Sequence, residues 1–118
     1  MAKPFSLKLA HAQHTADSLL CVGLDPDPDK MPDDLRLDTS PLYAFNRRIV
    51  DATFDIAAAY KPQIAFYSAL GAEQQLVDSI RYIRERAPAA LVILDAKRSD
   101  IGNTAAAYAR EAFDRYGA

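Results

Sequence analysis

The sequence predicts an α/β fold built from βαβ units with parallel strands. Short apolar runs alternate with longer segments whose apolar residues recur at helical spacing, and this alternation is typical of parallel sheets. Each apolar run also ends at a charged side chain: Asp25 after the first run, Lys61 in the second, and Asp95 and Lys97 in the third. The chain has 118 residues, half of them hydrophobic, which is enough for one domain with a core.

The first predicted strand covers residues 19–24 and follows a polar, helical stretch. That stretch contains His11 and His14, which we interpret as surface residues because no metal-ligand pattern surrounds them. Cys21, inside the apolar run, is expected to be a small buried side chain without a catalytic role. Proline and aspartate dominate the next segment, so we expect residues 25–40 to form one long surface loop.

The first crossover helix is predicted to begin at Ser40 and Pro41 and to end near Ala58. Serine is a good N-cap, and proline is favoured at the first helical position. Apolar residues at helical spacing predict the buried stripe, which comprises Phe45, Ile49, Thr53 and Ile56.

The second predicted strand covers residues 59–64, and Pro62 keeps the preceding Lys61 in an extended conformation. The next helix is predicted over residues 72–87, with Pro88 closing it. Its inward-facing residues should be Leu76, Ile80 and Ile83.

The third predicted strand runs from Leu91 to about Lys97, and a helix from residue 99 or 100 to Gly117 follows it. Because side chains alternate along a strand, Asp95 and Lys97 should share a side. Parallel strands connected by right-handed crossovers end at the same edge, so the charged residues of all three strands should meet there. A solvated turn with an incidental ion pair is the alternative for residues 95–100 alone.

Composition excludes several classes of function. The net charge is −2, and 14 basic and 16 acidic residues are mixed along the chain, which disfavours nucleic acid as a partner. No apolar stretch approaches the roughly 20 residues of a membrane span, and the N-terminus lacks a secretory signal. We therefore expect a cytoplasmic protein with no membrane partner.

Three segments resemble orotidine 5′-monophosphate decarboxylases, in the order found in that family. Residues 94–104, LDAKRSDIGNT, resemble the D-x-K-x-x-D signature, while residues 22–26 and 60–67 resemble the bacterial branch. The resemblance implies a (β/α)8 TIM barrel that converts the small-molecule substrate orotidine 5′-monophosphate to uridine 5′-monophosphate and carbon dioxide. This is the last step of pyrimidine nucleotide synthesis, and the family uses no metal or organic cofactor.

The resemblance also implies a role for each charged residue. Lys97 would donate a proton to the pyrimidine carbon that loses its carboxylate, and its ammonium would stabilise the carbanion there. Asp95 would lie against the departing carboxylate and hold Lys97 charged. Asp25 and Lys61 match ribose-side contacts, and Lys61 also belongs to the charge network around the reacting carbon.

Asp100 and Thr104 are expected on one face at the start of the third helix, because they are four residues apart. In the family, the matching residues reach the active site of a neighbouring subunit, which implies a homodimer. The alternative is that Asp100 caps its own helix.

The match to the family is incomplete. Gln63 stands where asparagine is more frequent and Ser99 where glycine is frequent. A (β/α)8 barrel takes roughly 250 residues, so residues 1–118 are expected to be the amino-terminal part of one barrel domain, about three βα units. The family's phosphate-binding loops and arginine lie in later units. We therefore expect the chain alone to be inactive and to associate with a complementing carboxyl-terminal segment or with itself.

Two rival functions follow from the same residues. One is a related magnesium-dependent sugar-phosphate aldolase or decarboxylase, which magnesium-dependent turnover would favour. The other is a non-catalytic assembly fragment, which predicts that Lys97→Ala leaves assembly intact and that no complex containing the chain decarboxylates orotidine monophosphate. The segment Asp100 to Thr104 fits the nucleotide enzyme better than the magnesium-dependent rival.

Overall fold

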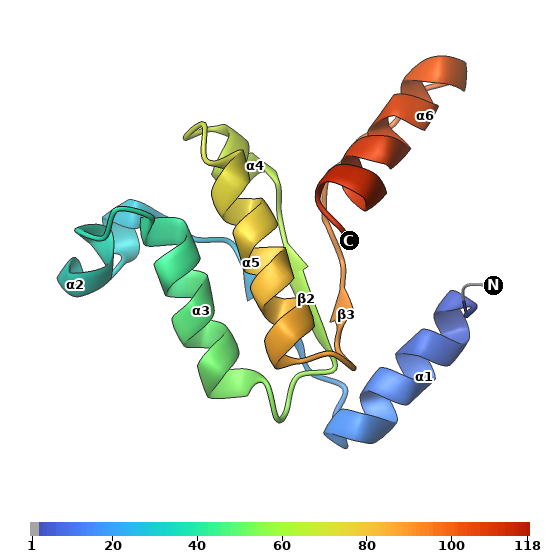
Figure 1. Ribbon diagram of the computed structural model, residues 1–118, viewed down its shortest axis with the longest axis horizontal. Helices are drawn as coiled ribbons and strands as arrows, with labels where there is room; N and C mark the ends of the chain where they lie inside the picture. The colour runs from blue at the N-terminus through green and yellow to red at the C-terminus, as the bar shows by residue number, and fades with distance from the viewer. Residues whose placement is uncertain (1–2) are drawn as a thin grey trace.

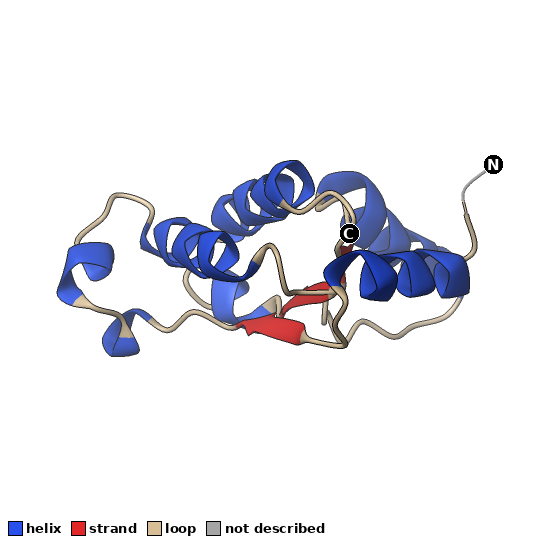
Figure 2. Ribbon diagram, turned by 90° about the horizontal axis from the view of Figure 1, so that it is seen from below, coloured by secondary structure: helices blue, strands red, loops and turns tan. Residues whose placement is uncertain are grey.

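The computed structural model describes residues 3–118, and these form a parallel three-stranded sheet with helices packed against it (Figures 1 and 2). The strands lie in the order β1 (Cys21–Leu24), β2 (Ala59–Pro62) and β3 (Leu91–Val92). Gly23 pairs with Lys61, Ala59 pairs with Leu91, and a further bridge joins Gln63 to Asp95. The predicted α/β class and parallel pairing are confirmed.

The helices connect the strands and flank the sheet (Figure 1). Their bounds are α1 Phe5–Ala16, α2 Asp33–Arg36, α3 Pro41–Thr53, α4 Ala65–Ser68, α5 Glu73–Arg86 and α6 Gly102–Arg110, with a 3₁₀ turn at Pro28–Lys30 and a π-helical turn at Glu111–Arg115. No helix among residues 3–118 is long and apolar enough to cross a bilayer.

The main core lies between the sheet and helices α3 and α5. Leu24 and Tyr60 face it from the strands and are fully buried. Helix α5 contributes Leu76, Ile80 and Ile83, all at most 2% exposed, which confirms the stripe predicted for this helix. Alternation along each strand leaves the intervening residues on the opposite face.

The opposite face of the sheet is partly open. Cys21 is exposed, so the prediction that it is buried was wrong. It belongs to the strand positions that alternate away from α3 and α5. The amino ends of β2 and β3 are nevertheless covered, because Ala59 and Leu91 pack against Ala12 of α1, with Leu9 beside them. Helix α1 thus covers part of this face.

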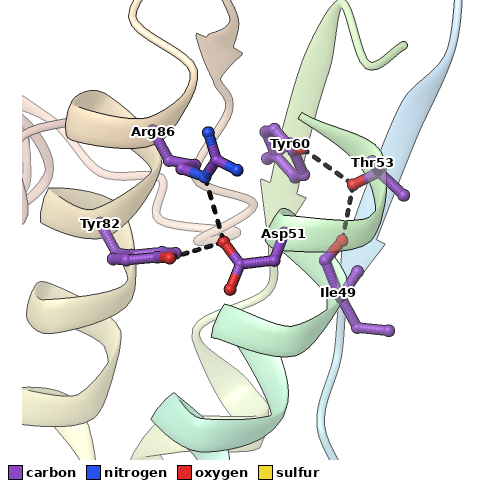
Figure 3. Close-up of polar contacts among 6 residues, drawn as sticks. All are labelled: Ile49, Asp51, Thr53, Tyr60, Tyr82 and Arg86. Atoms are coloured by element: carbon purple, nitrogen blue, oxygen red, sulfur yellow. Dashed lines mark hydrogen bonds and ion pairs between the residues drawn. The ribbon is translucent and has the colours of Figure 1, made fainter. Parts of the chain in front are cut away.

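Helix α3 ends at Thr53 rather than near Ala58, and its buried stripe differs from the predicted one. Thr53 Oγ1 donates to Ile49 O and lies 2.9 Å from Tyr60 Oη at the helix end (Figure 3). The fully buried residues of α3 are Leu42, Asn46 and Val50, and the predicted Phe45 and Ile49 are half-buried against the same core. Ile56, expected to be buried, lies beyond the end of the helix and is 49% exposed.

Ionic contacts join the outer surfaces of α3 and α5. Asp51 Oδ1 accepts from Tyr82 Oη at 2.6 Å and from Arg86 Nε at 3.2 Å (Figure 3). The Tyr82 hydrogen bond, with the Arg86 charge, lowers the pKa of the Asp51 carboxyl. Because the Asp51 and Arg86 side chains are well exposed, their ion pair contributes little to stability.

Residues 25–40 form the mainly exposed connection that their composition predicted, but the segment is not wholly irregular. The 3₁₀ turn and α2 interrupt it, and Pro26, Met31 and Leu35 are buried. Prolines just before or at the start of each turn explain the outcome, since a fixed φ suits the beginning of a helix. Three buried side chains therefore anchor a segment that is otherwise mostly exposed.

The start of α3 is capped from another helix. Gln75 Oε1, on α5, accepts from Leu42 N at 2.9 Å and from Tyr43 N at 3.1 Å. Ser40, the expected N-cap, makes no side-chain capping bond within the described chain. A long-range acceptor thus satisfies helix amides that would otherwise be unpaired.

Gln75→Leu is expected to lower the free energy of unfolding by about 1 kcal/mol, because it removes the acceptor for two helix amides. Urea unfolding followed by circular dichroism measures the change. Gln74→Leu is the matched control, because Gln74 is exposed and its side chain bonds only Asp78 among the contacts of residues 3–118. Equal effects of the two substitutions would contradict the capping role.

Candidate active site

The ends of β2 and β3 bring three charged side chains together. Lys97 Nζ donates to both carboxylate oxygens of Asp95, at 2.8 and 2.7 Å. Lys61 Nζ lies 3.8 Å from Asp95 Oδ2. The backbone holds Asp95 in place, because its N–H donates to Pro62 O at 2.9 Å and its carbonyl accepts from Ile64 N at 3.1 Å. The predicted meeting of Lys61, Asp95 and Lys97 is confirmed.

Lys97 does not lie on a strand, although the sequence predicted strand through this residue. Strand β3 ends at Val92, and Lys97 has φ of 49°, in the left-handed region that non-glycine residues seldom adopt. This conformation turns the backbone so that the Lys97 ammonium reaches back to the carboxylate two residues earlier. Unusual backbone of this kind is concentrated at functional sites, because the surrounding structure must hold it there.

One carboxylate therefore faces two ammonium groups. The hydrogen bond from Lys97 is the main cause that lowers the pKa of the Asp95 carboxyl, and the Lys61 charge lowers it further. The Asp95 side chain is 23% exposed and that of Lys97 is 70% exposed. Asp95 is consequently ionised at neutral pH, and the Lys97 ammonium is open to a ligand.

Lys97→Ala is expected to raise the pKa of Asp95 toward its usual value of 3.8, because the largest cause of the shift is removed. In the unsubstituted chain the folded carboxyl has the lower pKa. Its contribution to stability is therefore present above pH 3.8 and is lost as the pH falls from that value to the folded pKa. NMR titration of the side-chain carboxyl carbon measures both values, and an unchanged midpoint in the variant would contradict the pairing.

Asp25 lies at the carboxyl end of β1, where the sequence placed it, and it is exposed. Its Oδ2 is 3.9 Å from the point that a Cβ on Gly23 would occupy, so the carboxylate lies over Gly23. Gly23 is the residue paired with Lys61. Within residues 3–118, no ion pair joins Asp25 to Lys61 or Lys97, so Asp25 borders the charged group without contacting it.

Asp100 and Thr104 do not share the first turn of a helix as expected. Helix α6 begins at Gly102, so Asp100 precedes it, and both residues are exposed. The Asp100 carboxylate accepts from Ile101 N at 2.8 Å instead of capping the helix. The four-residue spacing was a poor guide here, because Gly102 has a φ of 53° and the helix begins only at this residue.

Sequence reasoning missed the contact that holds the segment after Lys97. Arg98 Nε lies 3.3 Å from Glu111 Oε2, and its guanidinium lies 5.4 Å from the ring centre of Tyr108. The Glu111 hydrogen bond raises the pKa of Arg98. Tyr108 and Glu111 follow Arg98 by 10 and 13 residues in the sequence. Such spacings form no local pattern, so these contacts could not be predicted from the sequence.

A recess of about 260 Å³ lies beside the charged group and includes Gln63, Asp95 and Lys97 in its lining. Small-molecule sites usually enclose roughly 300–1,000 Å³. The recess is smaller than most such sites, and the Asp95–Lys97 pair lines it. Among residues 3–118, no three His, Cys, Asp or Glu side chains are grouped as metal ligands.

The family model described as "Orotidine 5'-phosphate decarboxylase / HUMPS family" matches residues 18–118. The chain belongs to this family. Within it, the chain is 58% identical over 111 residues to orotidine 5′-phosphate decarboxylase of Variovorax paradoxus and 59% identical over 102 residues to that of Paracidovorax citrulli. These alignments cover 94% and 86% of this chain, but 40% and 37% of the relatives. The chain thus spans about 40% of the length of the curated family members it matches.

Solved structures of the decarboxylase family agree with the fold. A Toxoplasma gondii protein described as an orotidine-monophosphate-decarboxylase superposes with a TM-score of 0.85 at 38% identity, covering 98% of this chain and 39% of that one. The Leishmania donovani OMP decarboxylase gives 0.75 at 36% identity, covering 98% and 42%. The described residues therefore have the fold of part of a TIM barrel, as predicted.

Proposed function

We propose that this chain supplies the charged catalytic group of an orotidine 5′-monophosphate decarboxylase. The observation that carries the proposal is the bidentate contact of Lys97 with Asp95, with Lys61 Nζ 3.8 Å from the same carboxylate. The names of the relatives that are 58% and 59% identical support the same reaction. We further propose that residues 1–118 form the amino-terminal part of a single barrel domain.

The reaction breaks the bond between the pyrimidine ring and its carboxylate, and the electron pair of that bond stays on the ring carbon. This carbanion has no internal electron sink, so a fixed cation beside it is an effective stabiliser. In the proposed step, the Lys97 ammonium provides that charge and then transfers one proton to the carbon. Carbon dioxide leaves, uridine monophosphate forms, and the neutral amine regains a proton from solvent.

In this proposal Asp95 holds the Lys97 side chain in place. Both carboxylate oxygens of Asp95 accept charge-assisted hydrogen bonds from Lys97 Nζ, and these fix the direction of the ammonium. The Lys97 hydrogen bond and the Lys61 charge lower the pKa of Asp95, which favours the ionised form of its carboxyl before the substrate carboxylate approaches. We propose that the two like charges lie close in the bound state and separate as carbon dioxide departs.

The remaining roles are proposed by resemblance to the family. Asp25 and Lys61 would contact the ribose, and Asp100 and Thr104 would act across the interface of a homodimer. The exposed positions of Asp25, Asp100 and Thr104 are compatible with contacts to groups outside residues 3–118. A cytoplasmic location stays a prediction.

The magnesium-dependent sugar-phosphate rival is the less favoured function. The family description includes HUMPS proteins, but the relatives at 58% and 59% identity are named orotidine 5′-phosphate decarboxylases. The non-catalytic fragment is the other rival, and it differs in one measurable respect. It predicts no decarboxylation from any assembly that contains the chain.

A hybrid enzyme tests the proposal. It joins this chain to the carboxyl-terminal remainder of the Variovorax paradoxus relative, at the end of the aligned segment. We expect the hybrid to decrease the ultraviolet absorbance of orotidine monophosphate, with chelator present, and the chain alone to be inactive. A folded hybrid without turnover would contradict the proposed function, and turnover only with added magnesium would favour the rival.

A further inference from the structure

A buried network of polar side chains connects α3, α4 and α5 to the end of β1. Tyr67 Oη, on α4, donates to Leu24 O at 2.9 Å. Asn46 Nδ2 donates to Tyr67 Oη at 2.9 Å and to Ser79 Oγ at 2.9 Å, and Ser79 Oγ donates to Gln75 O at 2.7 Å. Tyr67, Asn46 and Ser79 are all at most 2% exposed.

Packing alone does not require these polar groups, since phenylalanine and leucine would fill similar volumes. Burying hydroxyls and an amide is unfavourable unless they are hydrogen-bonded. Asn46 Oδ1 has no hydrogen-bond partner within residues 3–118, so the network includes an unsatisfied buried acceptor. Burial also raises the pKa of the Tyr67 phenol, which keeps the hydroxyl protonated and able to donate. Together these contacts preserve the hydrogen bond that Tyr67 Oη donates to Leu24 O.

The Leu24 carbonyl is adjacent to the candidate site. It immediately precedes Asp25, whose carboxylate lies over Gly23, opposite Lys61. The residue before α4 is also bonded to the segment after β3, because Ile64 N donates to Asp95 O at 3.1 Å. Helix α4 thus contacts the backbone beside Asp25 at one point and the backbone of Asp95 at another.

We propose that Tyr67, oriented by Asn46, is a positioning residue that sets the end of β1, and with it Asp25, relative to the Asp95–Lys97 pair. The inference deepens the proposed function and rests on it. Tyr67 acts through the Leu24 carbonyl and does not itself touch the substrate. Positioning matters in such a site because a displacement of about 1 Å can reduce the rate by as much as 10²-fold.

Tyr67→Phe in the hybrid enzyme tests the inference, and Tyr60→Phe is the matched control. Tyr60 is equally buried, and its hydroxyl lies 2.9 Å from Thr53 Oγ1 at the end of α3 (Figure 3). Among the bonds of residues 3–118, Tyr67 and not Tyr60 donates to Leu24 O. Both variants lose one buried hydroxyl. At a temperature where both are folded, Tyr67→Phe should lower kcat/KM about ten-fold and Tyr60→Phe less than about two-fold. Asn46→Leu, which leaves Tyr67 without its donor, should resemble Tyr67→Phe.

A second measurement does not depend on activity. The ¹³C chemical shift of the Leu24 carbonyl should move in Tyr67→Phe and stay unchanged in Tyr60→Phe. Equal kcat/KM values for the two tyrosine variants would overturn the positioning role, as would an unmoved Leu24 shift in Tyr67→Phe. An inactive unsubstituted hybrid would count against the proposed function, and the Leu24 shift would still decide whether Tyr67 holds this carbonyl.

Discussion

Lys97→Ala in the hybrid enzyme is expected to lower kcat by about 10³-fold or more, because one substitution removes both the stabilising charge and the proton donor. The loss should appear in kcat and kcat/KM alike if the ammonium acts mainly in the transition state. Steady-state decarboxylation of orotidine monophosphate, followed by absorbance, measures it.

Lys8→Ala is the control for this substitution. Lys8 is an exposed lysine on α1, which packs at the amino ends of β2 and β3 through Ala12. Its removal deletes the same kind of side chain, and among residues 3–118 Asp95 pairs with Lys61 and Lys97 but not with Lys8. A Lys97→Ala enzyme that retains more than a tenth of the activity of Lys8→Ala would exclude Lys97 as the proton donor.

Leu76→Ala is expected to lower the free energy of unfolding by about 2–5 kcal/mol, because it leaves a cavity in the core between the sheet and α5. Leu76 is 0% exposed and belongs to the main hydrophobic cluster. Urea unfolding of the hybrid enzyme, monitored by fluorescence or circular dichroism, measures the change.

Leu37→Ala is the comparison, because it removes the same atoms from a side chain that is 81% exposed. Its effect should stay within about 0.5 kcal/mol. Similar losses for the two leucines would mean that α5 does not pack in the main core as described.

The parallel sheet and its charged edge were predictable from the sequence because both depend on local patterns. An apolar run that ends in Asp95 and Lys97 indicates a buried strand that reaches solvent, and the repeated arrangement at Lys61 indicates convergence. The contacts between these three side chains confirm that inference. The roles of the residues in catalysis stay predictions.

Other features were not predictable because their causes lie far away in the chain. Asn46 is polar in sequence but buried, since its partners Tyr67 and Ser79 are 21 and 33 residues distant. Cys21 lies in an apolar run, yet periodicity cannot tell which face of a strand is covered. The left-handed backbone of Lys97 has no sequence signal either, because lysine does not favour that conformation.

The contact from Gln75 to α3 has a consequence for the order in which the chain folds during synthesis. Gln75, which accepts from Leu42 N and Tyr43 N, is translated 33 and 32 residues after them. Until α5 has emerged and docked, the first turn of α3 should fray, because isolated helices of this length are marginal in water. The α3–β2–α5 segment is therefore expected to become stable as a unit, in one late cooperative step, instead of helix by helix.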